Sequence, residues 1–167
     1  MPRAAAYVLP MADTGEEMMV LLGRERSNRK WSGFGGGLER GESTAQGAAR
    51  EAWEESLGYL GKATEIKPHL VLLGEVKETA HTYYSLPIAY DEKLPEYYHM
   101  TYDFIRTCGK SKLQKHCSEK IQVVWVTWSH LKHSIMNGVR ELEHHIILQP
   151  TFFRELDEIL RNGTSLK

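Results

Sequence analysis

Short runs of apolar residues recur along the chain and predict the strands of a sheet. These runs are AAAYVL at 4–9, MMVLLG at 18–23, LVLLGEV at 70–76, TYYSLPIA at 82–89 and IQVVWV at 121–126. Their length and their content of β-branched and aromatic residues are typical of strands. Asp13, Thr14 and Gly15 separate the first two runs and suit a hairpin or short loop.

The spacing of polar and apolar residues predicts a helix between the second and third runs. Ser43 and Gln46 have the spacing of a capping box, which marks the start of a helix. Gly58 suits the left-handed residue that ends one. We therefore expect a helix from Ser43 to about Gly58.

The C-terminal part of the chain predicts one further helix and permits another. Apolar residues recur at helical spacing over 151–163, directly after a proline. A short helix over 128–137 is compatible with the pattern, whereas 91–120 has no clean period and is interpreted as a long irregular loop. Mixed strands and helices predict an α/β (α+β) sandwich, and the length of the chain suits a single domain over 1–167.

Composition and charge narrow the possible classes of function. The chain is 41% hydrophobic and 26% charged, as in soluble globular proteins, and its net charge of −1 disfavours a dedicated nucleic-acid binder. It contains no apolar run of membrane-spanning length and no signal-peptide core, so we expect a cytoplasmic protein without a membrane partner. Cys108 and Cys117 are interpreted as free thiols, because a zinc site formed with His99 and His116 has irregular spacing.

Three acidic residues are predicted to share one face of the helix that begins at Ser43. At about 100 degrees per residue, Glu51, Glu54 and Glu55 fall within an arc of about 100 degrees. The opposite, apolar face, which we expect to pack on the core, carries Ala45, Ala49, Ala52, Trp53 and Leu57. Carboxylates that project outward together repel each other, and a hard cation such as Mg²⁺ compensates them well. Arg50 is placed to orient Glu51.

The segment from Trp31 to Glu42 contains five glycines and leads directly into this acidic helix. We interpret it as a glycine-rich loop, since glycine allows the backbone to approach a ligand closely. The carbonyl oxygen of Gly35 is a candidate metal ligand.

The combined spacing of these glycines and acids resembles the signature of the Nudix hydrolase family. The matching residues are Gly36, Glu42, Arg50, Glu51, Glu54 and Glu55. The resemblance implies an αβα sandwich with a mixed sheet. It also implies that water attacks phosphorus in a nucleoside diphosphate linked to another moiety, with Mg²⁺ or Mn²⁺ as cofactor.

Carried over by position, the resemblance implies a role for each matching residue. Glu54 and Glu55 would ligate the metal with the Gly35 carbonyl, Glu51 would be a ligand or the base that activates water, and Arg50 would orient Glu51. Glu42 would belong to an outer acidic shell.

One position outside the motif can add to it, and one position within it departs from the family pattern. Family members often add an acid from outside the motif, and Glu119 is our candidate, although an exposed loop glutamate is the alternative interpretation. The family pattern has glycine where this chain has Leu57, and Gly58 follows. We therefore expect the end of the helix to be shifted by one residue, with the catalytic acids unaffected.

The segment from Trp31 to Gly36 is similar to that of oxidised-purine nucleoside triphosphatases within the family. This similarity implies that a nucleoside triphosphate is cleaved to monophosphate and pyrophosphate, with Ser32 and Phe34 at the base. Those enzymes also read the purine with adjacent carboxylates, for which Glu141 and Glu143 are the counterparts here, though they are not adjacent.

Other substrates and one other class of function remain open. Aromatic and basic residues in 91–120 suit a nucleotide or another highly phosphorylated ligand. Inositol pyrophosphates, dinucleoside polyphosphates and capped RNA ends are therefore alternatives. A binding module without activity is a further alternative, against which the intact acids argue.

Overall fold

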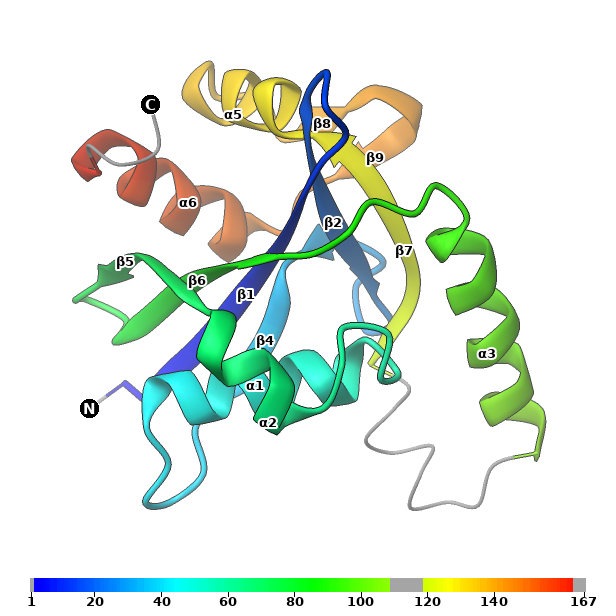
Figure 1. Ribbon diagram of the computed structural model, residues 1–167. Helices are drawn as coiled ribbons and strands as arrows, with labels where there is room; N and C mark the ends of the chain where they lie inside the picture. The colour runs from blue at the N-terminus through cyan, green and yellow to red at the C-terminus, as the bar shows by residue number, and fades with distance from the viewer. Residues whose placement is uncertain (1, 109–118, 164–167) are drawn as a thin grey trace.

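The computed structural model describes residues 2–108 and 119–163, which form a twisted mixed sheet with helices on both faces (Figure 1). The main-sheet strands are β1 (Ala5–Asp13), β2 (Met18–Glu25), β3 (Trp31–Ser32), β4 (Phe34–Gly37), β5 (Val71–Val76), β6 (His81–Pro87) and β7 (Lys120–Thr127). The helices are α1 (Thr44–Glu55), α2 (Ala63–Ile66), α3 (Leu94–Cys108), α5 (Trp128–Met136) and α6 (Pro150–Asn162). Smaller elements are the 3-10 helices η1 (Lys67–His69) and η2 (Glu143–His145) and the two-stranded ribbon of β8 (Glu141–Leu142) and β9 (Ile146–Ile147).

The sheet has strand order β3-β2-β1-β6-β5, with β4 also paired to β1 and β7 to β2. β1 and β6 are parallel, from Ala5 opposite His81 to Met11 opposite Pro87, and the other pairs are antiparallel. All five predicted strands are confirmed, with ends that differ by a few residues. Among the described residues, no helix is long and apolar enough to cross a membrane.

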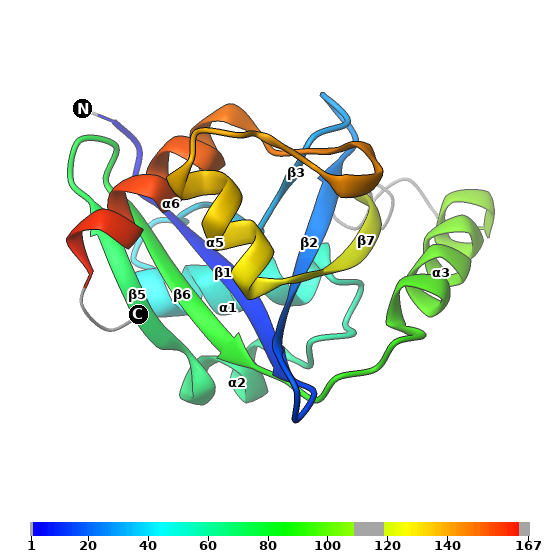
Figure 2. The ribbon, with the colours of Figure 1, turned by 90° about the horizontal axis from the view of Figure 1, so that it is seen from above.

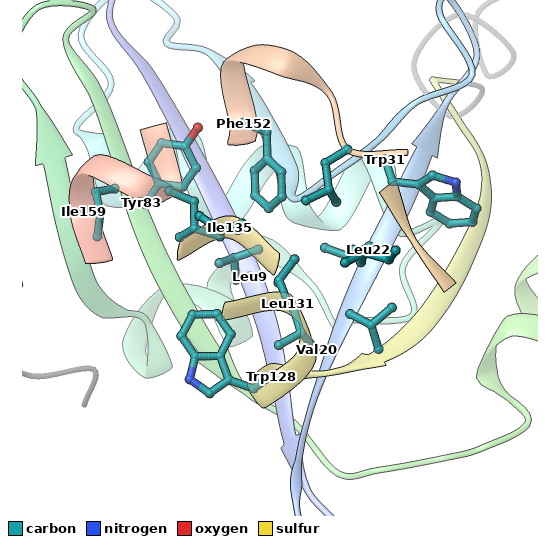
Figure 3. Packing of buried hydrophobic residues seen from close by; sticks show 14 of the residues in the cluster. Leu9, Val20, Leu22, Trp31, Tyr83, Trp128, Leu131, Ile135, Phe152 and Ile159 are labelled. Carbon is teal, nitrogen blue, oxygen red and sulfur yellow. The ribbon is translucent and has the colours of Figure 1, made fainter. Parts of the chain in front are cut away.

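Each face of the sheet carries its own apolar core. Side chains alternate along β1, so Leu9 belongs to one core and Val8 to the other. The first core packs under α5 and α6, where Leu131 and Phe152 meet Leu9 (Figure 3). The second lies on the opposite side of the sheet, where α1 runs behind the strands in Figure 2, and it includes Tyr98 and Tyr102 of α3. The expected αβα sandwich is therefore confirmed.

The interpretation of 91–120 as an irregular loop is wrong over its first half, which contains the helix α3. Tyr98 and Tyr102 lie one turn apart and are buried, whereas Tyr97 and Phe104 are exposed. Because aromatic residues occupy both faces of this helix, they gave no clean apolar period. Residues 109–118, including Cys117 and His116, lie outside the described residues.

The glycine stretch is also not a loop throughout, because it forms β3 and β4. In β4, Gly35 lies opposite Tyr7 of β1. A Cβ atom at Gly35 would collide with the carbonyl oxygen of Ala6 and with the Tyr7 ring. Glycine is therefore needed here for close packing of backbone on backbone, although it has low strand propensity.

The end of α1 differs from the expected shift. Ser43 caps the start through the predicted capping box, and the helix ends at Glu55. Leu57 itself adopts the left-handed conformation, with φ 56°. Its N–H donates to Glu54 and that of Gly58 donates to Trp53, which is the Schellman pattern. The helix end is thus not displaced, and a leucine tolerates the conformation usually taken by glycine.

The predicted apolar face of α1 is partly wrong. Ala49 and Ala52 are buried as expected, but the side chain of Trp53 is 44% exposed. Glu55 lies on the buried face instead. Compared with the prediction, the buried face of the helix is therefore shifted toward Glu55 and away from Trp53.

A buried carboxylate fastens α6 to the sheet. Glu155 is 1% exposed and accepts hydrogen bonds from Thr79 Oγ1 and Tyr83 Oη, while His81 Nδ1 lies 2.8 Å from its Oε1. Tyr83 in turn stacks on Tyr7, with ring centroids 5.0 Å apart. The packing of α6 against β6 therefore depends on a fully satisfied polar cluster.

We expect Glu155→Ala to lower the free energy of unfolding by about 3 kcal/mol or more, because it removes the partner of the buried Tyr83 hydroxyl and of the half-buried Thr79 and His81. Chemical denaturation measures the loss. Glu158→Ala, at an exposed position of the same helix, should change stability by less than about 0.5 kcal/mol. Equal effects of the two substitutions would contradict this role for Glu155.

Candidate active site

The candidate site lies where α1 crosses beneath β4. The backbone N–H of Gly35 donates to Glu55 Oε1 at 2.8 Å. A Cβ atom at Gly36 would lie 2.7 Å from Glu51 Oε1, so this glycine leaves room for the second carboxylate. The glycines of β4 and the acids of α1 therefore form one packed unit.

Three carboxylates converge at this position. Oxygen atoms of Glu51, Glu55 and Glu119 lie within 4.8 Å of one another. Glu119 directly precedes β7, and its carbonyl accepts the N–H of Arg26 at 2.9 Å. The expectation that all the acids project outward is wrong for Glu55, which is 4% exposed. Hard oxygen donors at this separation fit a divalent cation such as Mg²⁺.

Arg50 organises the acids around this group. Its guanidinium donates from Nε and Nη2 to both oxygens of Glu42, at 2.8 and 3.0 Å, and from Nη1 to Glu51 Oε1 at 3.1 Å. Nη2 also donates to the Gly37 carbonyl at 3.1 Å. Glu54 lies outside the group of three, with its Oε2 3.5 Å from Arg50 Nη1. Arg50 therefore holds Glu51 in place, and Glu42 completes the network as an outer acid.

The electrostatics of the acids follow from their burial. Burial raises the pKa of the Glu55 carboxyl well above its ordinary value, an effect that nearby Lys120 opposes and Glu119 reinforces. Burial also raises the pKa of Glu51, against the influence of Arg50. Hydrogen bonding to Arg50 lowers the pKa of Glu42. The inner carboxylates are thus destabilised in the absence of a cation, and the outer one is stabilised.

A cavity of about 440 Å³ opens beside the carboxylates. Glu55 and Glu119 line one part of it, and Glu25, Ser32 and Lys120 line another. Lys120 is 3% exposed, and its ammonium donates to Ser32 Oγ at 2.7 Å. Sequence reasoning missed Glu25 and considered Lys120 only as one of the basic residues of 91–120, because a charged residue at a strand end is usually solvated and only the fold shows that this lysine is buried.

The predicted substrate-binding residues have different positions. Ser32 lines the cavity, as expected. Phe34 is fully buried in the core beneath α1, so its side chain is unavailable for stacking on a base. Glu141 is exposed in β8, and its Oε1 lies 3.2 Å from His145 Nδ1. It is not among the described residues that line the cavity.

The helix α3, which was not predicted, supports the site through one buried tyrosine. The hydroxyl of Tyr98 lies 2.8 Å from the carbonyl oxygen of Glu55 and 2.7 Å from that of Lys120. This fully buried side chain therefore ties the end of α1 to the start of β7. The positions of Glu55 and Glu119 relative to each other depend on this contact.

Comparison with known proteins identifies a family for this arrangement. The family model described as the NUDIX domain matches residues 1–146. A comparison with curated protein sequences finds no match.

Solved structures with a similar fold include the NUDIX domain of Shewanella oneidensis NrtR in complex with ADP ribose. It has a TM-score of 0.54 and 13% identity, covering 96% of this chain and 87% of that chain. The C. elegans Ap4A hydrolase has a TM-score of 0.48 and 15% identity, covering 96% and 95%. A MutT/nudix family protein from Enterococcus faecalis has a TM-score of 0.48 and 16% identity, covering 76% of this chain, which spans 44% of that protein.

We expect the metal-free protein to lose stability as the pH rises above the ordinary glutamate pKa of 4.5. The folded state binds the Glu55 proton more tightly than the unfolded state. Its contribution is therefore complete below the unfolded pKa and is lost as the pH rises through the raised folded pKa. Denaturation in chelator at several pH values, from about pH 5 to 8, measures this slope.

Glu55→Gln keeps an oxygen for the Gly35 N–H and should flatten the slope, while also removing the stabilisation by added Mg²⁺. Glu75→Gln, at an exposed position of β5, should keep both the slope and the stabilisation by Mg²⁺. An unchanged slope in Glu55→Gln would show that this carboxyl does not control the pH dependence.

Proposed function

The chain belongs to the NUDIX family of pyrophosphohydrolases, and on this basis we propose that it hydrolyses a nucleoside triphosphate to monophosphate and pyrophosphate with Mg²⁺ or Mn²⁺. The observation that supports this reaction is the continuity of one cavity. It runs from the carboxylates Glu55 and Glu119 to the polar pocket of Ser32 and Lys120. A nucleotide bound along it would have its phosphates at the acids and its base in the polar pocket.

The chain's own residues suit the roles expected of such a site. Glu51, Glu55 and Glu119 would hold the cation, together with the Gly35 carbonyl, and Glu54 would join them by turning away from Arg50. A divalent ion bound there lowers the pKa of a coordinated water and offsets the charge of the phosphate oxygens.

As an alternative to ligating the cation, Glu51 can act as the general base. Burial raises the pKa of Glu51, which makes its carboxylate a better acceptor of a proton from water. Arg50 acts as a positioning residue, because its guanidinium fixes the Glu51 carboxylate at 3.1 Å and is itself held by Glu42. These contacts would keep the Glu51 carboxylate in one orientation toward the water from which it accepts a proton.

We expect Mg²⁺-dependent release of pyrophosphate and nucleoside monophosphate from at least one nucleoside triphosphate in a substrate panel. Product identification by ³¹P NMR in ¹⁸O-labelled water reports which phosphorus is attacked. The panel should include dinucleoside polyphosphates, inositol pyrophosphates and capped RNA, since preferential cleavage of one of these would replace the proposed substrate.

The double variant Glu54→Gln, Glu55→Gln should lower kcat about 100-fold or more, because it removes the charge that holds the cation. Glu16→Gln, in the exposed hairpin between β1 and β2, is the matched control. Activity that persists in the double variant would overturn the assignment of these acids, and absence of hydrolysis by the unmodified chain across the panel would overturn the proposed reaction.

A further inference from the structure

Lys120 is a buried ammonium with unused hydrogen-bonding capacity. It carries three N–H donors. Within the described part of the chain, the ammonium donates to Ser32 Oγ at 2.7 Å, and the nearest carboxylate oxygen, Glu25 Oε1, lies 3.9 Å away. The ring of Phe34 lies 5.9 Å from the ammonium. Two N–H groups of a 3%-exposed cation therefore remain for an occupant of the cavity that it lines.

The backbone is built to place this lysine in the cavity. The pairing of β2 with β7 shifts between Arg24 and Glu25, so that Glu25 pairs with Lys120. Irregularities of this kind re-aim side chains near functional sites. Gly23 leaves room for the lysine stem, since a Cβ atom there would lie 2.8 Å from Lys120 Cδ. Bulge, glycine and buried lysine thus form one arrangement.

An acceptor accompanies this donor on the cavity wall. Glu25 Oε1 receives a hydrogen bond from Ser32 Oγ at 3.1 Å, and Oε2 receives one from Asn28 Nδ2 at 2.7 Å. A carboxylate has about four lone-pair sites, so Glu25 can also accept from a ligand. The cavity therefore presents a cationic donor and an anionic acceptor side by side.

We propose that Lys120 and Glu25 select a nucleobase that presents an oxo group next to a ring N–H, as in hypoxanthine, guanine and uracil. A carbonyl oxygen accepts a hydrogen bond from a free N–H group of the ammonium, whereas the exocyclic amino group at the same position of adenine is a donor. The adjacent N–H of the base would donate to Glu25. An exocyclic amino group facing Lys120 would instead meet a like-signed partial charge.

In this arrangement Lys120 is a specificity-determining residue, and Ser32 acts through it. Ser32 is 6% exposed, and its hydroxyl accepts from Lys120 while it donates to Glu25 or to the Gly33 carbonyl. The function of Ser32 is then to hold the ammonium of Lys120 in place. The inference rests on the proposed function, because the base must share the cavity with the catalytic acids.

Binding of two matched probes tests the inference without hydrolysis. Inosine 5′-monophosphate carries the oxo group and the ring N–H, and purine riboside 5′-monophosphate lacks both. In the presence of Mg²⁺, calorimetric titration of the unmodified chain should show tighter binding of the inosine nucleotide by about 10- to 100-fold, the range of a charged hydrogen bond. Adenosine 5′-monophosphate should bind more weakly than the inosine nucleotide.

Lys120→Met should reduce this ratio at least tenfold and leave the affinity for the purine riboside nucleotide near that of the unmodified chain. Lys77→Met, at an exposed turn, should keep the full ratio. If thermal melting shows that Lys120→Met does not fold, Ser32→Ala decides the question, because it removes the ammonium's partner and should lower the same ratio.

The inference is overturned if the unmodified chain binds the two probes equally or prefers adenosine 5′-monophosphate. It is also overturned if the ratio persists in folded Lys120→Met. These outcomes are distinct from failure of the proposed function, which would appear as absence of hydrolysis while the binding preference remained. A general loss of affinity for all three probes, with an unchanged ratio, would assign Lys120 a purely structural role.

Discussion

The site depends on the close packing of α1 against the glycines of β4. Gly35 and Gly36 allow the helix to approach the strand so closely that Glu55 accepts a backbone N–H and Glu51 occupies the space of an absent Cβ. A larger residue at either position would push the helix away or displace a carboxylate. One steric constraint thus decides both the packing of the second core and the geometry of the acids.

This constraint concentrates negative charge in a partly dry environment, and the surrounding structure compensates it in two ways. Arg50 draws Glu42, Glu51 and Glu54 into a network at the outer side of the helix. Lys120 lies at the inner side and opposes the rise in the pKa of Glu55. The remaining repulsion among the acids is what a bound cation would relieve, and it is a cost that the metal-free fold carries for function.

Elements far apart in the chain hold these groups together. Tyr98 of α3 connects the end of α1 with the start of β7, and the hydrogen bond of Arg26 fixes the backbone at Glu119. Glu155 fastens α6 on the opposite face of the sheet, under the ring of Tyr83 that stacks on Tyr7. Because Tyr7 also borders the cavity, both faces of the sheet contribute to its shape.

The sequence by itself determined the strands, the capped acidic helix and the family, because alternation, capping and motif spacing are local patterns that need no knowledge of distant contacts. It also proposed Glu119, which the fold brings to Glu51 and Glu55. Tertiary structure alone decided that Glu55 is buried, that Phe34 belongs to the core, that Leu57 takes a left-handed conformation and that Lys120 lines the cavity. The burial of a side chain and its hydrogen-bond partners depend on residues that are distant in sequence. In α3, which has aromatic residues on both faces, the buried face is decided only by packing against the sheet.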